Sequence, residues 1–338
     1  MIRILATKIY KNMKAIIVLL AVMAATFSSC DESVPEPKKT ATAIYVAGND
    51  GYKATYWKNG VATNLTNGVN RAVAQSIYVS GKDIHVAGSE IAKGKWRARY
   101  WKNGIVTNLT NGPNSSSAFS VFVSGSDVYV AGNDGLAAIC WKNGIATTLG
   151  FGRASSVFVS GSDVYVAGQV GHDATYWKNG VATTLAAPAE SHNSANSIFV
   201  SGKDVYVAGN HILDGTSQHA IYWKNGVATL LANNHWSFAT SIFAARSNVY
   251  VASCHNDPLV TAKYWKNDNP ISLVEGESGG AHSIFVSGSN VYVAGSQGSF
   301  AKYWKNGVPT SLTNVEPWAA AYSIFVTEIT SADSSTDF

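Results

Sequence analysis

The chain has 338 residues, of which 25 are basic and 21 acidic, and charged residues make up only 14% of it. This length allows a large buried core, while the sparse and nearly balanced charge excludes a basic surface for nucleic acid. Besides Cys30 there are two cysteines, Cys140 and Cys254, whose spacing fits neither a disulfide framework nor a zinc site. We therefore expect two free, buried thiols, no metal and no cofactor.

The first 30 residues have the features of a secretion signal. A basic start precedes residues 15–27, an apolar stretch too short to span a bilayer. Residues 27–30, Phe-Ser-Ser-Cys, resemble a bacterial lipobox, which implies lipid attachment at Cys30; a plain signal peptide is the alternative. Cys30-Asp31-Glu32 also resembles the export signature of surface-exposed lipoproteins of some Gram-negative bacteria, and residues 31–42 predict a flexible tether.

Removal of this signal would leave 21 basic and 21 acidic residues, because four basic residues lie in it. We expect a surface-exposed protein anchored at the outer membrane of a Gram-negative bacterium, touching the membrane only through the lipid on Cys30. A periplasmic-facing or a secreted protein is the alternative.

The tripeptide Trp-Lys-Asn recurs seven times in similar surroundings. Its tryptophans are Trp57, Trp101, Trp141, Trp177, Trp223, Trp265 and Trp304, separated by steps of 44, 40, 36, 46, 42 and 39 residues. A period near 40 that is built only of strand-like segments is typical of a β-propeller.

One repeat, residues 156–185, contains four apolar runs separated by turns, which we call strands a, b, c and d. Ser-Gly-x-Asp joins a to b, and Asn-Gly, the strongest short hairpin signal, joins c to d. The runs are apolar on both faces, which is typical of strands covered on both sides.

The first repeat lacks strand a, and the chain ends with an unmatched strand a at residues 323–326. We therefore predict an all-β fold over residues 43–327: a seven-bladed β-propeller of four-stranded antiparallel blades, closed by the C-terminal strand pairing into the N-terminal blade. Residues 328–338 would form a polar tail. The architecture resembles WD-repeat and kelch propellers, and the W-x-N-G-x-x-T-x-L pattern is similar to blades of secreted bacterial repeat proteins. The chain lacks the Gly-His…Trp-Asp pair and the Gly-Gly doublet, so the partners of those families are not implied.

The a–b and c–d turns barely change between repeats, whereas the b–c and d–a loops vary in length and lie together at one end of the strands. We call that end the loop rim and expect binding there, because loops on a rigid scaffold commonly carry function. Trp96, Trp236 and Trp318 lie in these loops. They would form platforms for sugars, or alternatively cap the core.

Strand a is preceded in every repeat by Ala-x-Ser, in which x varies. The variable residues are Gln75, Phe119, Ser155, Asn196, Thr240, His282 and Tyr322. We expect them to surround the mouth of a central channel, where a mixture of polar and aromatic groups suits one asymmetric ligand. A wet, unconstrained mouth is the alternative.

Most histidines also lie on the loop rim. They are His172, His192, His211, His219, His235, His255 and His282, accompanied by Asp173, Glu190, Asp214 and Asp257. These residues could form a metal or anion site or a pH-sensitive surface, but no metal-ligand spacing occurs, so solvated polar side chains are the favoured interpretation. On the opposite rim, the seven lysines of Trp-Lys-Asn would form a cationic ring or, in the favoured interpretation, solvated turn residues.

These features predict a monomeric, non-catalytic recognition protein that binds a glycan or a protein on the loop rim. Residues 276–280 match G-x-S-x-G, but they lack the strand–turn–helix context of a nucleophile elbow. The alternatives are a glycan hydrolase or lyase that uses the rim histidines and acidic residues, and an envelope scaffold or assembly subunit.

Overall fold

The computed structural model describes residues 41–186, 192–213, 217–231, 236–256, 260–274, 277–314 and 318–329. Residues Thr42–Glu328 form one compact unit. The predicted signal segment, Cys30, the tether up to residue 40 and the tail from residue 330 lie outside the described residues. Within the described part, no helix is long and apolar enough to cross a membrane.

The described residues form 27 strands in six antiparallel sheets, five of which have four strands. The first has the order β27-β1-β2-β3 (Ala320–Ile329, Ala41–Asp50, Lys53–Lys58, Val61–Asn64) and the second β4-β5-β6-β7 (Ala72–Ser80, Asp83–Ala92, Lys95–Lys102, Ile105–Asn108). The others are β15-β16-β17-β18 (Asn193–Ser201, Asp204–Leu213, Ser217–Lys224, Val227–Leu230), β19-β20-β21-β22 (Ser237–Ala245, Asn248–Asn256, Val260–Lys266, Asn269–Ser272) and β23-β24-β25-β26 (Gly279–Ser287, Asn290–Gln297, Phe300–Lys305, Val308–Ser311).

The sixth sheet has seven strands, in the order β14-β13-β12-β11-β10-β9-β8. They are Val181–Thr184, Asp173–Lys178, Asp163–Val170, Ile145–Ser160, Ala137–Lys142, Asp127–Asp134 and Ser116–Ser124. The 16-residue β11 pairs with β10 through its first half and with β12 through its second half.

The predicted seven-bladed propeller of separate four-stranded blades is therefore wrong, because the structure has six sheets and none of them is closed. The physical reason lies in β11, which runs through the place where a d–a loop was expected. Gly150 and Gly152 have φ values of 136° and 150°, which glycine adopts without strain, and the β10–β11 register shifts between Ala138 and Ile139. The prediction of an all-β fold is correct, and the last strand does lie beside the first, since β27 neighbours β1.

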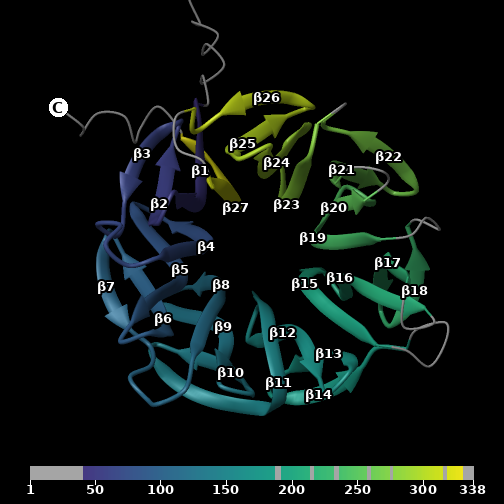
Figure 1. The fold of residues 1–338 in the computed structure, drawn as a ribbon. Coiled ribbons are helices and arrows are strands. Elements are labelled where there is room, and N and C mark those ends of the chain that lie inside the picture. The colour runs from purple at the N-terminus through teal and green to yellow at the C-terminus, as the bar shows by residue number, and fades with distance from the viewer. Residues whose placement is uncertain are drawn as a thin grey trace, which may run out of the picture. The chain divides into compact units, whose positions relative to one another are not determined.

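The innermost strands contact one another through side chains in a closed circuit, although no sheet closes. Figure 1 shows β4, β8, β15, β19, β23 and β27 nearest the centre of the compact unit. Seven aromatic rings, one from the first strand of each repeat, follow one another with centroids 4.4 to 5.2 Å apart. They are Tyr78, Phe122, Phe158, Phe199, Phe243, Phe285 and Phe325, and Phe325 contacts Tyr78 again. Each such pair stabilises the packing beyond its burial of apolar area.

The repeated tryptophans form the core between sheets. Six of the seven are at most 1% exposed, and the exception is Trp265 at 8%. Trp57 of the first sheet packs in one cluster with Ile324 and Val326 of β27 and with Tyr292 of the last sheet. Both cysteines are buried and free, as predicted, and burial raises the pKa of each thiol to about 11.

A candidate ligand-binding cavity lined by bulged residues

In six of the seven Ala-x-Ser segments, the variable residue is the extra residue of a β-bulge. The hydrogen-bonded ladder skips that residue, for example between Ala74 and Ser76 and between Ala281 and Ser283. The same shift occurs at Phe119, Ser155, Asn196 and Thr240. A bulged residue is left out of the pairing and its side chain is re-aimed. The backbone therefore needs no particular side chain at this position.

The constant neighbours have structural roles that explain why they do not vary. The preceding alanines are fully buried in every repeat. Each following serine accepts a hydrogen bond from a backbone amide of the next repeat, as in Val121 N to Ser76 Oγ at 3.1 Å. Six further bonds of this kind join the other neighbouring repeats, so that the serine hydrogen bonds form a closed circuit around the protein. Their amide donors belong to Val157, Ile198, Ile242, Ile284, Ile324 and Ile77. Within the Ala-x-Ser segment, only the middle residue is therefore free to vary.

The side chains of the seven variable residues line one cavity of about 270 Å³. They are Gln75, Phe119, Ser155, Asn196, Thr240, His282 and Tyr322, all half-buried, and Arg153 completes the lining. We call this the central cavity. The sequence placed all seven of these residues around one opening, and the structure brings them together there.

Two polar side chains of the central cavity are held by bonds to the backbone of the next innermost strand. Asn196 Nδ2 donates to Ala239 O at 2.8 Å, and Thr240 Oγ1 donates to Ala281 O at 2.7 Å and approaches Ala252 O at 3.0 Å. One of the two amide hydrogens of Asn196 and the hydroxyl hydrogen of Thr240 are therefore used within the protein. The amide oxygen of Asn196 and the lone pairs of the Thr240 hydroxyl remain as acceptors.

The ionisable residues of the central cavity differ in charge at neutral pH. The rings of His282 and Tyr322 lie 5.3 Å apart at an angle of 40°. Burial lowers the pKa of His282 to about 4 and raises the pKa of Tyr322, so both are neutral at pH 7. Arg153 keeps its charge, and its Cζ lies 3.9 Å from the centroid of the Phe119 ring.

Sequence reasoning missed Arg153. It lies on β11 two residues before the bulged Ser155, at a position that also varies between repeats. The equivalent residues are Val73, Ser117, Ser194, Phe238, Gly280 and Ala320, so Arg153 is the one charged residue of this set. That contrast was visible in the sequence and could have indicated a role.

A second cavity of about 360 Å³ adjoins the first, because Phe119 and Arg153 line both. We call it the side cavity. Its other lining residues are Asn133, Gly135, Leu136, Phe151, Gly152 and Gln169. Leu136 is 71% exposed and Phe151 63% exposed, so two large apolar side chains face solvent here. This is the place where β11 replaces a d–a loop.

The structure gives each of the three predicted tryptophan platforms a different setting. Trp96 is half-buried on β6, with the guanidinium of Arg71 5.9 Å from its ring. Trp236 and Trp318, 48% and 78% exposed, each lie shortly before an innermost strand and adopt positive φ values of 62° and 74°. None of them is among the residues that line the central or the side cavity.

The prediction that the rim histidines are solvated is wrong for three of them. His211, His219 and His255 are 1%, 5% and 2% exposed. His211 Nδ1 lies 2.7 Å from Asn193 Oδ1, and His255 Nε2 lies 2.9 Å from Ser253 Oγ. His172 and His192 are exposed, with ring centroids 3.9 Å apart. Four residues of this set, His235, Glu190, Asp214 and Asp257, lie outside the described residues. The residues that the structure describes contain no group of three or more His, Cys, Asp or Glu side chains that could hold a metal ion.

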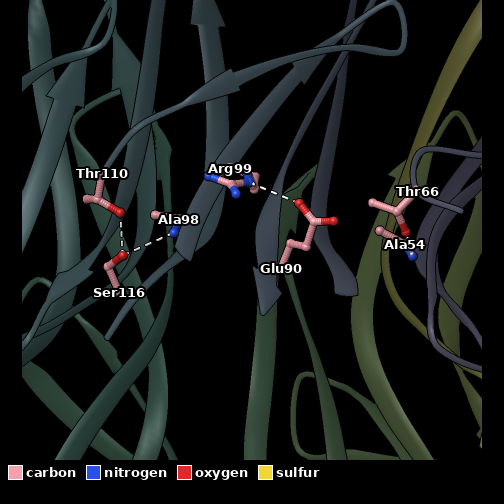
Figure 2. Close-up of polar contacts among 7 residues, drawn as sticks. All are labelled: Ala54, Thr66, Glu90, Ala98, Arg99, Thr110 and Ser116. Carbon is pink, nitrogen blue, oxygen red and sulfur yellow. Dashed lines mark hydrogen bonds and ion pairs between the residues drawn. The ribbon is translucent and has the colours of Figure 1, made fainter. Parts of the chain in front are cut away.

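Polar contacts also link loops and strands near the loop rim. Figure 2 shows Ala54 N donating to Thr66 Oγ1 at 3.0 Å, and Ala98 N donating to Ser116 Oγ at 3.1 Å, where Thr110 is a second partner of Ser116. The same view shows the ion pair between Arg99 Nε and Glu90 Oε2 at 3.2 Å. The bonds of Thr66, Thr110 and Ser116 tie two d–a loops to strand c, whereas the ion pair joins strands b and c of the second sheet.

The opposite rim carries ion pairs within single repeats. Lys102, Lys142, Lys178 and Lys224 pair with Asp83, Asp127, Asp163 and Asp204 at 2.7 to 3.0 Å. Hydrogen bonds from the lysine and from the Asn of the Asn-Gly turn lower the pKa of each carboxyl. Four of the seven lysines are thereby neutralised, which argues against a uniform cationic ring.

No protein family model and no curated protein sequence matches the chain. Among the solved structures that it resembles is one from B. thetaiotaomicron, described as the extracellular domain of a putative hybrid two-component system. The two share 8% sequence identity at a TM-score of 0.46, over 76% of this chain and 38% of the other. The chain thus spans well under half the length of this structure.

Proposed function

We propose that this protein is a non-catalytic recognition protein that binds a glycan in the central cavity. The observation that carries the proposal is the contrast at Ala-x-Ser. The alanine and serine are constant because they are buried and bonded, whereas the residues between them differ in all seven repeats and line one cavity. Packing gives no reason for this mixture, and a single asymmetric ligand does.

The cavity's chemistry favours a sugar ligand. Amide and hydroxyl groups of Gln75, Ser155, Asn196 and Thr240 can bond to sugar hydroxyls, and the rings of Phe119 and Tyr322 offer apolar faces. A hydrolase would need a pair of carboxyl groups about 5–10 Å apart. Among the described residues that line the central cavity there is no Asp or Glu. The surface location is proposed from the lipobox-like segment that ends at Cys30.

The test is a cavity-filling substitution with a matched control. Ser155→Trp would occupy much of the 270 Å³, while Ser155→Ala leaves it open. Both changes are at a bulge, so both variants should fold. With full-length protein on an array of oligosaccharides, we expect the wild type and Ser155→Ala to retain the same sugars and Ser155→Trp to lose them. Retention by all three would place binding elsewhere on the rim, and no retention by the wild type would point to a protein ligand.

A lyase is the second candidate, and one observation favours it. His282 and Tyr322 lie ring to ring in the central cavity, and such a pair could take the proton next to a sugar carboxylate and return one to the leaving oxygen. That elimination leaves a carbon–carbon double bond in the product. A rise in ultraviolet absorbance on incubation with polygalacturonate, absent in Tyr322→Phe, would replace the recognition proposal with this one.

A further inference from the structure

The central cavity has one uncompensated charge. Arg153 contributes a guanidinium, and the other residues of its lining are neutral at pH 7. No carboxylate of the described residues forms an ion pair with Arg153. Its Cζ lies 3.9 Å from the centroid of the Phe119 ring, and the residue as a whole is exposed to solvent. The donors of a guanidinium are suited to a carboxylate, which they can bind through two parallel hydrogen bonds.

From this geometry we infer that the ligand is an oligosaccharide containing a uronic acid, whose carboxylate binds Arg153. The inference rests on the proposed glycan-binding function and narrows its substrate class. A uronic acid places a carboxylate and several hydroxyls on one ring. The hydroxyls can donate to the free oxygens of Asn196 and Thr240, since one amide hydrogen of Asn196 and the hydroxyl hydrogen of Thr240 bond the backbone. A carboxylate alone could not use those acceptors, because it has no hydrogen to donate.

The side cavity indicates where the next sugar of the chain lies. It shares Phe119 and Arg153 with the central cavity, so a ligand can pass from one to the other beside the guanidinium. No d–a loop stands between the two cavities, because β11 continues as one strand through Gly150 and Gly152. The exposed side chains of Leu136 and Phe151 would contact the apolar face of the second ring. The site is therefore built for at least two linked sugars.

The test uses the full-length protein and pairs of probes in which a methyl ester replaces the charged carboxylate. The probes are the trimers of galacturonate, glucuronate and mannuronate, each with its methyl ester, measured by calorimetry. We expect at least one acid trimer to bind at least tenfold more tightly than its ester. Arg153→Gln should abolish that preference, and Arg153→Lys should keep part of it. Arg246→Gln, which removes the same charge from the β19–β20 turn at the opposite rim, should behave as the wild type.

A second pair of variants tests the path across β11. Phe151→Ala should weaken the trimer at least threefold and leave the monomer unchanged. Equal binding of acids and esters, or neutral sugars retained equally by wild type and Arg153→Gln, would overturn this inference and leave the glycan-binding proposal standing. If no saccharide binds at all, or an acidic peptide binds in its place, both fail.

Discussion

The guanidinium of Arg153 lies over the ring of Phe119, with Cζ 3.9 Å from the ring centroid. The two residues belong to neighbouring repeats, since Phe119 is the bulged residue of β8 and Arg153 lies on β11. Because both line the central and the side cavity, their contact stands at the junction of the two. The fused strand β11 and the bulge of β8 are thus both needed to place one cation there.

Replacement of Phe119 by leucine should weaken binding of the uronate trimers through Arg153. A cation–π contact is worth about 0.5–2 kcal/mol, which corresponds to a roughly two- to thirtyfold loss of affinity. Calorimetry on Phe119→Leu, Arg153→Gln and the double variant forms a cycle that isolates the coupling. Additive losses would show that Phe119 acts independently of Arg153.

The serine circuit should contribute measurably to stability. Ser120→Ala removes the acceptor of the Val157 amide, now 3.1 Å away, from a residue that is only 4% exposed. An amide left without a partner costs about 1–3 kcal/mol, so the denaturation midpoint should fall. Ser124→Ala on the same strand is the control, because its hydroxyl makes none of the described hydrogen bonds. Equal midpoints for the two variants would contradict the role of the circuit.

A side chain at Gly132 should disturb the packing, because a Cβ there would lie 2.0 Å from Ser117 O and 2.9 Å from Trp141 Cζ3. The sixth repeat shows what a side chain does at this place. Ser253 pairs with Ala239 as Gly132 pairs with Ala118, and Trp265 of that repeat is 8% exposed where Trp141 is 1%.

We expect Gly132→Ala to lower the free energy of unfolding by about 3 kcal/mol or more through overpacking. Gly112→Ala, with no atom within 4 Å of its Cβ, should change it by less than about 0.5 kcal/mol. Urea denaturation measures both. A small effect at Gly132 would mean that the strands move apart at little cost.

Much of the candidate site was predictable because its residues stand between constant neighbours. The variation of Gln75, Asn196 and His282 beside fixed alanines and serines indicated a shared environment, and the bulges are its physical cause. Arg153 was missed because its position was not compared between repeats. Arg153 also lines both cavities because no d–a loop precedes it, and this absence is seen only from the continuous strand β11.

The strands and turns of the fold were predictable from the sequence, but the division of the strands into sheets was not. Strand types and turns follow from apolar runs and Asn-Gly pairs, whose asparagines all have φ values near 50°. The fusion at β11 was not foreseen, although the 36-residue step between Trp141 and Trp177 is the shortest of all. The burial of His255 could not be predicted from its own surroundings. It depends on Ser253, which bonds both His255 and the indole of Trp265.

The buried histidines should make the protein less stable as the pH falls from about 6.5 to about 4. Burial, with a smaller effect of Lys263, lowers the pKa of His255 to about 4, and burial does the same for His282. Between these values and the ordinary value near 6.5, the unfolded chain binds protons that the folded chain does not. The free energy of unfolding therefore decreases with falling pH, by on the order of 3 kcal/mol in all for His255.

Replacement of His255 by glutamine, which keeps a hydrogen-bonding group near Ser253, should flatten this part of the stability curve. Below pH 4 the curve should fall in wild type and variant alike. There the carboxyls of Asp83, Asp127, Asp163 and Asp204, whose pKa values are lowered by their partners, take up protons and lose their ion pairs. Urea denaturation at half-unit steps from pH 7.5 to 3 separates the two windows. An unchanged slope between pH 6.5 and 4 in His255→Gln would show that His255 is not the group that titrates.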